Sequence, residues 1–278
     1  ARVYNNLQAL SIYKQILEIE PDPVKKLELR YKIADINWLT GAWKEAYEEV
    51  TRIQADALAS GADRVAFDTH HFIGIASFYR NDIETSKIQF DLGIKLAERL
   101  NDPLMLCIAN SNLGNLNQLQ KNYDKALEFH KLSLELATGL NQKQRTAKTL
   151  SNLGLIYLEQ ENYPLAEDYL KQSLNIATEN RLLKEESIAL GNLGYAKMLQ
   201  KDNAAAMPLL EKKLKLAEAM NDKLELIKVL GNIGNIHREE QRPEQALACY
   251  QRILALRIYL GDESGAAKTR ELIESFNK

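Results

Sequence analysis

The feature that most constrains this chain is a repeat of 40 residues. Blocks that start at residues 111, 151, 191 and 231 open with Ser-Asn-Leu-Gly, Ser-Asn-Leu-Gly, Gly-Asn-Leu-Gly and Gly-Asn-Ile-Gly, and no insertion separates them. The blocks at 111 and 151 are identical at 14 of 40 positions. Although 278 residues would suggest two globular domains, a fixed period of this length predicts one array of stacked, similar units.

The same register extends over almost the whole chain. One column of small residues holds Gly74, Gly114, Gly154, Gly194 and Gly234, and a second holds Ala46, Ser86, Ala126, Ala166, Ala206 and Ala246. We predict a half repeat at 1–30, full repeats at 31–70, 71–110, 111–150, 151–190, 191–230 and 231–270, and a partial repeat at 271–278.

Each period contains two helical patterns. Leu150, Leu153, Gly154 and Tyr157 follow the i, i+3, i+4, i+7 spacing of one helix face. The second pattern comprises Leu165, Ala166, Tyr169, Leu170, Ser173, Leu174 and Ala177. The segment 160–164 between them reads as a short turn, with Pro164 in the first turn of the next helix. Second helices are expected to end near Asn101, Asn221 and Gly261, which tolerate a left-handed conformation.

Three local features add expectations about packing. The Gly and Ala columns predict that Gly154 and Ala166 mark a close crossing of two antiparallel helices. Pro208, about five residues into a second helix, predicts a kink or a late helix start. The first two blocks are rich in aromatic residues, which predicts different packing or curvature there; they include Trp38, Trp43, Tyr47, Phe67, Phe72, Phe78 and Tyr79.

These residues resemble the tetratricopeptide repeat. Its pattern of Leu-Gly, a Tyr three residues later, then Ala, an aromatic and a small residue is matched by Leu153, Gly154, Tyr157, Ala166, Leu170 and Ser173. The period of 40 resembles the longer-repeat branch that includes Partner-of-Inscuteable-type scaffolds and bacterial signalling proteins, with kinesin light chains more distant. The resemblance implies an all-α, right-handed superhelical solenoid of antiparallel helix pairs over 1–278. The chain departs from the pattern at the Tyr position, which holds Asn37, Ser77, Asn117, Lys197 and His237 in the other blocks.

Composition limits the classes of function. Thirty-six Lys and Arg against 38 Asp and Glu give a net charge of −2, so the global basic field typical of nucleic-acid binding is absent. Two distant cysteines, Cys107 and Cys249, argue against a disulfide framework and favour a reducing compartment, so we expect a cytoplasmic protein. No apolar run approaches the length of a membrane span, and no signal peptide is recognisable.

No catalytic constellation is evident. His70, His71, His130 and His237 form no spaced ligand pair, and the nucleotide-binding and nucleophile-elbow motifs are absent. We interpret the histidines as packed or solvated and the two cysteines as small apolar residues. The sequence therefore predicts a noncatalytic protein without a metal or cofactor.

The resemblance implies that the first helix of each repeat lines a concave groove. Asn112, Asn152, Asn192 and Asn232 recur once per repeat beside the core stripe, and amides can hydrogen-bond the backbone of an extended peptide. In the family, Asn at such positions commonly contacts peptide. The candidate peptide-binding residues are Asn112, Asn115, Asn152, Leu155, Asn192, Tyr195, Asn232, Asn235 and Arg238, with Gln118 and Met198 as further neighbours. The alternative is that each Asn bridges adjacent helices or is merely solvated.

Two functions remain open at this point. The first is a noncatalytic interaction module that binds a segment of a protein partner in the groove. The second is a regulatory sensor, in which a peptide or an intramolecular contact controls an attached catalytic domain outside this chain. An enzyme in its own right is the third and least supported hypothesis.

Overall fold

The computed structural model describes residues 2–277, with side chains from residue 6 to residue 276. Over this range the chain forms fourteen α-helices and a terminal 3₁₀ turn, and no strand is found between these limits. The expected all-α architecture of helix pairs is confirmed. The helices divide into two compact units, Ala1–Leu140 and Asn141–Lys278.

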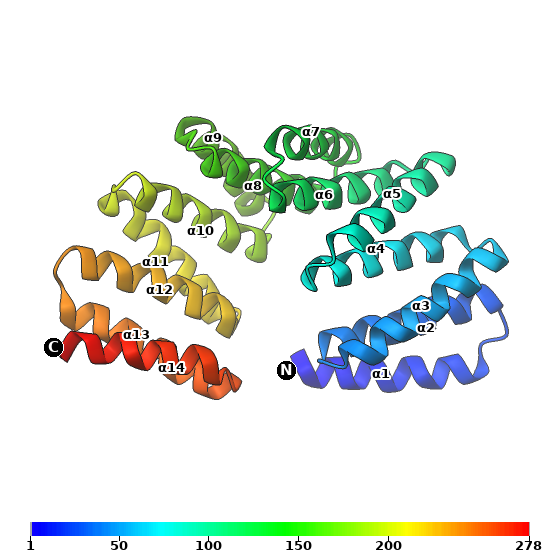
Figure 1. Cartoon of the computed structure of the whole chain (residues 1–278), viewed down its shortest axis with the longest axis horizontal. Coiled ribbons are helices and arrows are strands. Elements are labelled where there is room, and N and C mark those ends of the chain that lie inside the picture. The colour runs from blue at the N-terminus through cyan, green and yellow to red at the C-terminus, as the bar shows by residue number, and fades with distance from the viewer. Residues whose placement is uncertain (1, 278) are drawn as a thin grey trace. The chain divides into compact units, whose positions relative to one another are not determined.

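The first unit contains seven helices (Figure 1), coloured from blue to green. Their bounds are α1 Arg2–Ile19, α2 Pro23–Leu39, α3 Trp43–Ser60, α4 Asp63–Tyr79, α5 Ile83–Arg99, α6 Pro103–Leu119 and α7 Tyr123–Gly139. Each helix packs on the next along the chain, and the pairs α2/α3, α4/α5 and α6/α7 have the most extensive contacts. They are the helix pairs that the repeat predicts.

The second unit repeats this arrangement. Its helices are α8 Lys143–Glu159, α9 Tyr163–Glu179, α10 Leu183–Leu199, α11 Asn203–Ala219, α12 Lys223–Glu239, α13 Pro243–Leu260 and α14 Glu263–Glu274, followed by the 3₁₀ turn η1 Ser275–Asn277. The main pairs are α8/α9, α10/α11 and α12/α13, and the first helices α8, α10 and α12 also contact one another in order. That these units join into one right-handed superhelix over 1–278, with the repeat boundaries given above, stays a prediction.

The turns between helices share one geometry that recurs every 20 residues. Asn101, Asn221 and Gly261 have φ values of 49°, 52° and 71°, which confirms the left-handed helix ends expected there. The same conformation is imposed on residues without a local preference for it, among them Glu161 and Lys201, both at φ 59°. At these positions, then, the packing of helices overrides residue preference.

The Gly column marks close approach between the two helices of a pair. A Cβ on Gly154 in α8 would lie 2.6 Å from Cγ of Leu170 in α9 and 3.2 Å from the carbonyl oxygen of Ala166. The crossing predicted at Gly154 and Ala166 is therefore present, but Leu170 supplies most of the contact. In the other pairs the Gly faces Phe90, His130, Leu210 or Tyr250, which all occupy the same position of the second helix.

Pro208 does not delay its helix. Helix α11 begins at Asn203, in register with the other second helices, and continues through Pro208 to Ala219. The late helix start was therefore wrong; the kink stays a prediction. The side chain of Asp202 caps the first turn by accepting a hydrogen bond from the backbone N–H of Ala205. Packing of Ala206 and Leu210, both fully buried, holds the helix on either side of the proline.

The Tyr position of the repeat is used differently in successive pairs. Tyr157 stacks on Tyr169 with ring centroids 5.4 Å apart. One repeat later Lys197 instead reaches the carboxylate of Glu167 at 2.5 Å. The departure from Tyr at position 197 is thus accompanied by a charged contact between successive helix pairs.

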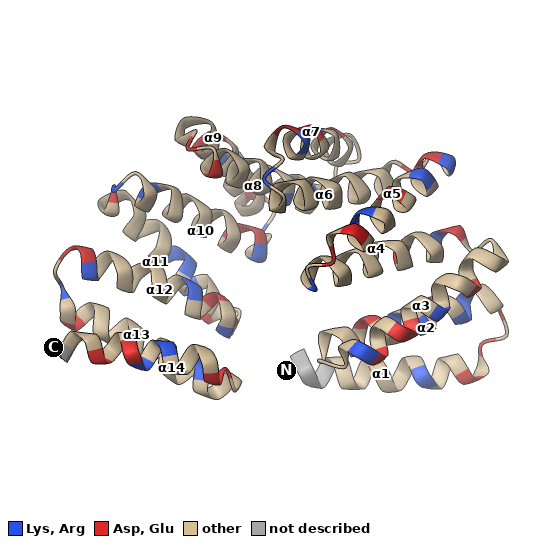
Figure 2. Cartoon of the chain, viewed as in Figure 1, with Lys and Arg blue, Asp and Glu red and all other residues tan. Residues whose placement is uncertain are grey.

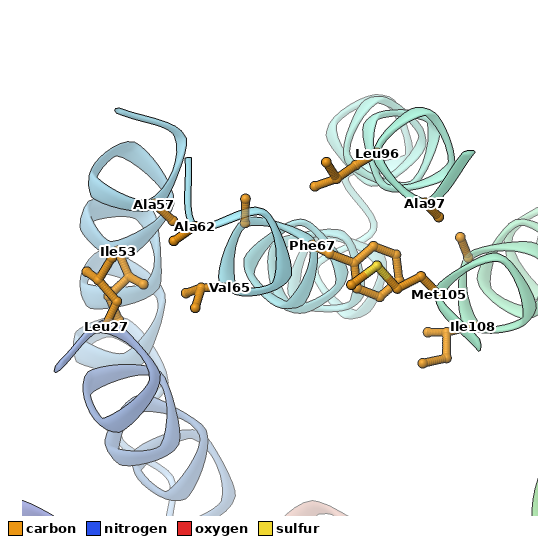
Figure 3. Packing of buried hydrophobic residues seen from close by; sticks show 12 residues of the cluster. Leu27, Ile53, Ala57, Ala62, Val65, Phe67, Leu96, Ala97, Met105 and Ile108 are labelled. Carbon is orange, nitrogen blue, oxygen red and sulfur yellow. The ribbon is translucent and has the colours of Figure 1, made fainter. Parts of the chain in front are cut away.

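A core of small and apolar residues fills the first unit between α2 and α6. Phe67 of α4 and Met105 of α6 lie together in this cluster (Figure 3), with Ala97 and Ile108 near them, while Ile53 lies beside Leu27 at its other end. Of the aromatic residues at this end, Phe67 and Phe72 are buried, and the different packing or curvature expected there stays a prediction. Trp43 and Tyr79, from the same aromatic group, are exposed instead.

Candidate binding surface

The predicted asparagines occupy equivalent positions on successive first helices. Asn112 lies on α6 in the first unit, while Asn152, Asn192 and Asn232 lie on α8, α10 and α12 in the second. Because α8 contacts α10 and α10 contacts α12, the three asparagines of the second unit form a row across neighbouring helices. We call this set of three the amide row.

Asn112 and Asn235 are among the predicted residues that have partners inside the protein, as Asn115 and Asn152 also do. The Nδ2 of Asn112 lies 2.6 Å from Nδ1 of His71 on α4, so this amide bridges two first helices. The Oδ1 of Asn235 accepts a hydrogen bond of 2.9 Å from the hydroxyl of Tyr250. At Asn112 the structural alternative raised by the sequence is therefore realised.

Asn192 differs from these. Its side-chain nitrogen is buried and finds no hydrogen-bond partner within residues 2–277. Leaving a buried amide N–H unsatisfied costs about 1–3 kcal/mol. The side chains of Asn152, Asn232 and Asn115 are half-buried on their helices.

The neighbouring side chains offer varied chemistry. Tyr195 is 45% exposed on α10, and Arg238 is exposed near the end of α12. Leu155 is half-buried and packs against the cluster that includes Leu158 and Leu193, and Met198 packs in the next cluster. Of the predicted neighbours, therefore, Tyr195 and Arg238 present the most surface.

The histidines and cysteines take structural positions, as interpreted from the sequence. The buried His70 lies 2.8 Å from Oε1 of Gln89, and burial lowers the pKa of its imidazole despite that contact. His130 is fully buried against Gly114. Burial raises the pKa of the Cys249 thiol, which opposes thiolate chemistry. Among the residues that the structure covers, no group of His, Cys, Asp and Glu is arranged to hold a metal ion.

The structure also reveals a site that the sequence reasoning missed. A cavity of about 940 Å³ in the first unit is lined by Trp38, Trp43, Lys44, Tyr47, Glu48, Tyr79 and Arg80. We call it the aromatic pocket. Its signal in the sequence was present: position 43 holds Trp, where the equivalent positions hold Ile83, Tyr123 and Tyr163. Periodicity does not tell, however, whether such a ring is buried or exposed.

Charges of both signs are interspersed along the helices of each unit (Figure 2). The most perturbed carboxylate is that of Glu167, whose side chain is 14% exposed. Burial by itself would raise its pKa, but hydrogen bonds from Lys197, Gln200 and Lys171 outweigh that effect and lower the pKa to about 2. This cluster joins α9 to α10 and is explained by packing.

The sequence model of the tetratricopeptide repeat family matches residues 104–179 and 185–258, together more than half of the chain. The chain belongs to this family. A search among curated proteins found no relative that matches. No helix in the described part of the chain has the length and apolar character needed to cross a membrane.

Solved structures of other tetratricopeptide repeat proteins share the fold. The apo form of RapI is similar with a TM-score of 0.72 and 15% identity, covering 92% of this chain and 93% of that one. A Rap protein complexed with Competence and Sporulation Factor has a TM-score of 0.62 and 13% identity, over 95% and 79% of the two chains.

A third similar structure is larger. It is a signal-transduction ATPase with numerous domains from Pyrococcus horikoshii that has a tetratricopeptide repeat sensor. The TM-score is 0.68 at 15% identity, and the match covers 95% of this chain but 44% of the other. At these identities the likeness concerns the fold. Tetratricopeptide repeats are in general noncatalytic scaffolds, which places this chain among protein-interaction or regulatory domains.

Proposed function

We propose that this chain is a noncatalytic interaction module that binds an extended segment of a partner protein along the first helices of its pairs. The observation that carries the proposal is the amide row, in which the buried nitrogen of Asn192 lacks an acceptor from residues 2–277. Asn112 is engaged by His71, so the proposal rests on the second unit, with Asn112 and Asn115 as secondary contacts.

The spacing of the row suits a peptide backbone. Packed helices lie about 8–10 Å apart, and an extended peptide advances about 3.3 Å per residue. Successive asparagines would therefore meet every third peptide group. An amide can donate to a carbonyl and accept from an N–H, so such a row holds the backbone without reading the side chains.

Selectivity would come from the residues beside the row. Tyr195 offers an exposed ring for an apolar or proline side chain. Arg238 offers a guanidinium for a carboxylate on α12, the next first helix after α10. Leu155 and Asn235 complete the edges of the surface as apolar and polar contacts. A ligand with an apolar residue followed by an acidic one fits this order.

The proposal is tested by selecting peptides from a random display library on the whole chain and measuring their affinity by calorimetry. Changing Asn152, Asn192 and Asn232 to Ala together should weaken the selected peptides at least about tenfold, because three backbone contacts are lost. Asn175→Ala is the matched control, since Asn175 is exposed on the second helix α9. Failure to select any peptide, or equal affinity in the triple variant, would refute the proposal.

A regulatory role is the second candidate, and one comparison favours it. The Pyrococcus horikoshii protein has a tetratricopeptide repeat sensor within a longer chain, and this chain matches 44% of it. In that function the peptide bound at the amide row would change the activity of an attached catalytic domain. The regulatory role is tested by the gene sequence on both sides of this segment. We expect the same open reading frame to encode a catalytic domain next to it, and the absence of such a domain would contradict the regulatory role.

A further inference from the structure

The aromatic pocket of the first unit lies where α2, α3 and α4 end or begin, among the helices coloured blue to cyan in Figure 1. Trp43 is 63% exposed and Tyr79 is 74% exposed. Trp38 is held edge-on against Phe72, with centroids 5.3 Å apart, and Arg80 lies over the ring of Tyr47 at 5.2 Å. Two rings are thus fixed by packing, and two project into solvent.

The exposure of Trp43 departs from the repeat. The equivalent residues Ile83, Tyr123 and Tyr163 begin their own second helices and are half-buried. An exposed aromatic side chain is less favourable in free energy than a buried one, because its apolar surface stays in contact with water. Clustering of such rings around a cavity is typical of binding sites.

The charges at the pocket are not balanced within the chain. Glu48 is paired along its helix with Arg52 at 3.9 Å. Lys44 and Arg80 form no salt bridge with the side chains described between residues 6 and 276, although the charge of Arg80 also acts on Asp82. The pocket therefore combines aromatic faces with two cations, Lys44 and Arg80, against the single carboxylate of Glu48, and this excess of positive charge complements a ligand with negative charge.

The hydrogen-bonding groups point to the same kind of ligand. The indole nitrogens of Trp38 and Trp43 and the hydroxyls of Tyr47 and Tyr79 have no partner in the part of the chain that the structure describes. Indole and ammonium groups only donate, and phenols donate readily. A ligand rich in acceptors and poor in donors satisfies them best.

We propose that the aromatic pocket binds a proline-rich segment of another protein that has an acidic residue beside the prolines. Such a segment adopts the polyproline II conformation, in which the carbonyl groups are solvated acceptors and the prolines carry no N–H. Its rings stack on aromatic side chains at low entropic cost. The adjacent carboxylate pairs with Arg80 or Lys44. This site shares no residue with the amide row.

Intrinsic fluorescence provides the test, because Trp38 and Trp43 are the two tryptophans of the sequence and both line the pocket. The probe is an acetylated peptide Pro-Pro-Pro-Pro-Glu-Glu, titrated into the whole protein. The comparison peptides are Pro-Pro-Pro-Pro-Lys-Lys and Gly-Ser-Gly-Ser-Glu-Glu. We expect a saturable change in tryptophan emission with the first peptide, and responses at least about tenfold weaker with the other two.

Three variants locate the effect. Tyr79→Ala keeps both tryptophans and should weaken the acidic peptide about tenfold. Arg80→Glu should reverse the preference in favour of the lysine peptide. Tyr259→Ala removes a ring that is 73% exposed in the second unit and should change nothing. Circular dichroism confirms that each variant is folded.

The outcomes separate this proposal from its rivals. An equal response to the Gly-Ser peptide, or an unchanged affinity in Tyr79→Ala, overturns it. Emission that depends on protein concentration without peptide would show that copies of this chain cover the pocket, and would also overturn it. Since the amide-row variants leave the pocket intact, either proposal can fail without the other.

Discussion

Replacing Gly154 by Ala would place a methyl group inside the close crossing of α8 and α9. The added carbon would lie 2.6 Å from Cγ and 2.8 Å from Cδ2 of Leu170, and 3.2 Å from the carbonyl oxygen of Ala166. Leu170 and Ala166 are fully buried, so neither can move into solvent. The substitution must therefore separate α8 from α9 or force Leu170 out of its rotamer.

The two opposing effects have known sizes. Ala is favoured over Gly in a helix interior by about 1 kcal/mol. Overpacking of a well-filled contact costs about 1–3 kcal/mol. The sum predicts that Gly154→Ala lowers the free energy of unfolding by about 0–2 kcal/mol.

Gly231 supplies the matched control. It lies inside α12, and a Cβ there would meet nothing within 4 Å. Gly231→Ala should therefore keep the helical gain and raise the free energy of unfolding by about 0.5–1 kcal/mol. The prediction is that two identical substitutions, both in first helices, have opposite signs or differ by about 1–3 kcal/mol.

Urea denaturation of the whole chain, followed by circular dichroism, measures both changes. A double-mutant cycle with Leu170→Ala then assigns the cost: the penalty of Gly154→Ala should fall by about 1–3 kcal/mol once Leu170 is truncated. If Gly154→Ala stabilises the protein as much as Gly231→Ala does, the close-crossing argument is refuted. A penalty that persists without Leu170 would refute the assignment to that contact.

Three further predictions concern charge and backbone strain. The pKa of Glu167 in the folded protein is about 2, below the ordinary value of 4.5, so its carboxylate stabilises the protein above pH 4.5 and this contribution is lost as the pH falls towards 2. Glu167→Gln should therefore destabilise the protein at neutral pH and progressively less in acid. Urea midpoints measured across this pH range would show the difference. Glu225→Gln removes the carboxylate that lies 2.7 Å from the ammonium of Lys213, whose side chain is 9% exposed, and should lower the free energy of unfolding by about 3 kcal/mol. The added change Lys213→Met should recover most of this loss in the same assay. No recovery would contradict the assignment of the loss to an uncompensated buried charge. Lys201→Gly relieves a left-handed backbone at φ 59° and should raise the free energy of unfolding by about 0.5–1 kcal/mol, which a higher thermal midpoint would show. A lower midpoint would show that the side chain of Lys201 matters more than the backbone strain.

Much of the fold could be predicted from residue spacing, because a helix face repeats along the sequence in a fixed way. The Gly and Ala columns identified the crossing of α8 and α9, and Asn101 and Gly261 marked helix ends. Of the two outcomes expected at Pro208, the late helix start was wrong, because α11 begins in register and Ala206 and Leu210 are buried on either side of the proline; the kink stays a prediction. The proposed site was predictable only as a row of positions. Spacing placed Asn112 and Asn192 equivalently, yet Asn112 is bonded to His71 and the buried nitrogen of Asn192 has no acceptor in residues 2–277.

The sequence alone determined the period, the pairing of helices and the family, since these depend on contacts between residues at constant separation. The tertiary structure decided which side chains are buried and which are exposed. Trp43 is open to solvent where the equivalent Tyr123 is half-buried, and Lys197 pairs with Glu167 where the equivalent Tyr157 stacks on Tyr169. Both differences depend on side chains of neighbouring helices. Those contacts form only when one helix pair is laid on the next. Repetition therefore fixes the scaffold, and the departures from it create the pocket and the charged contacts.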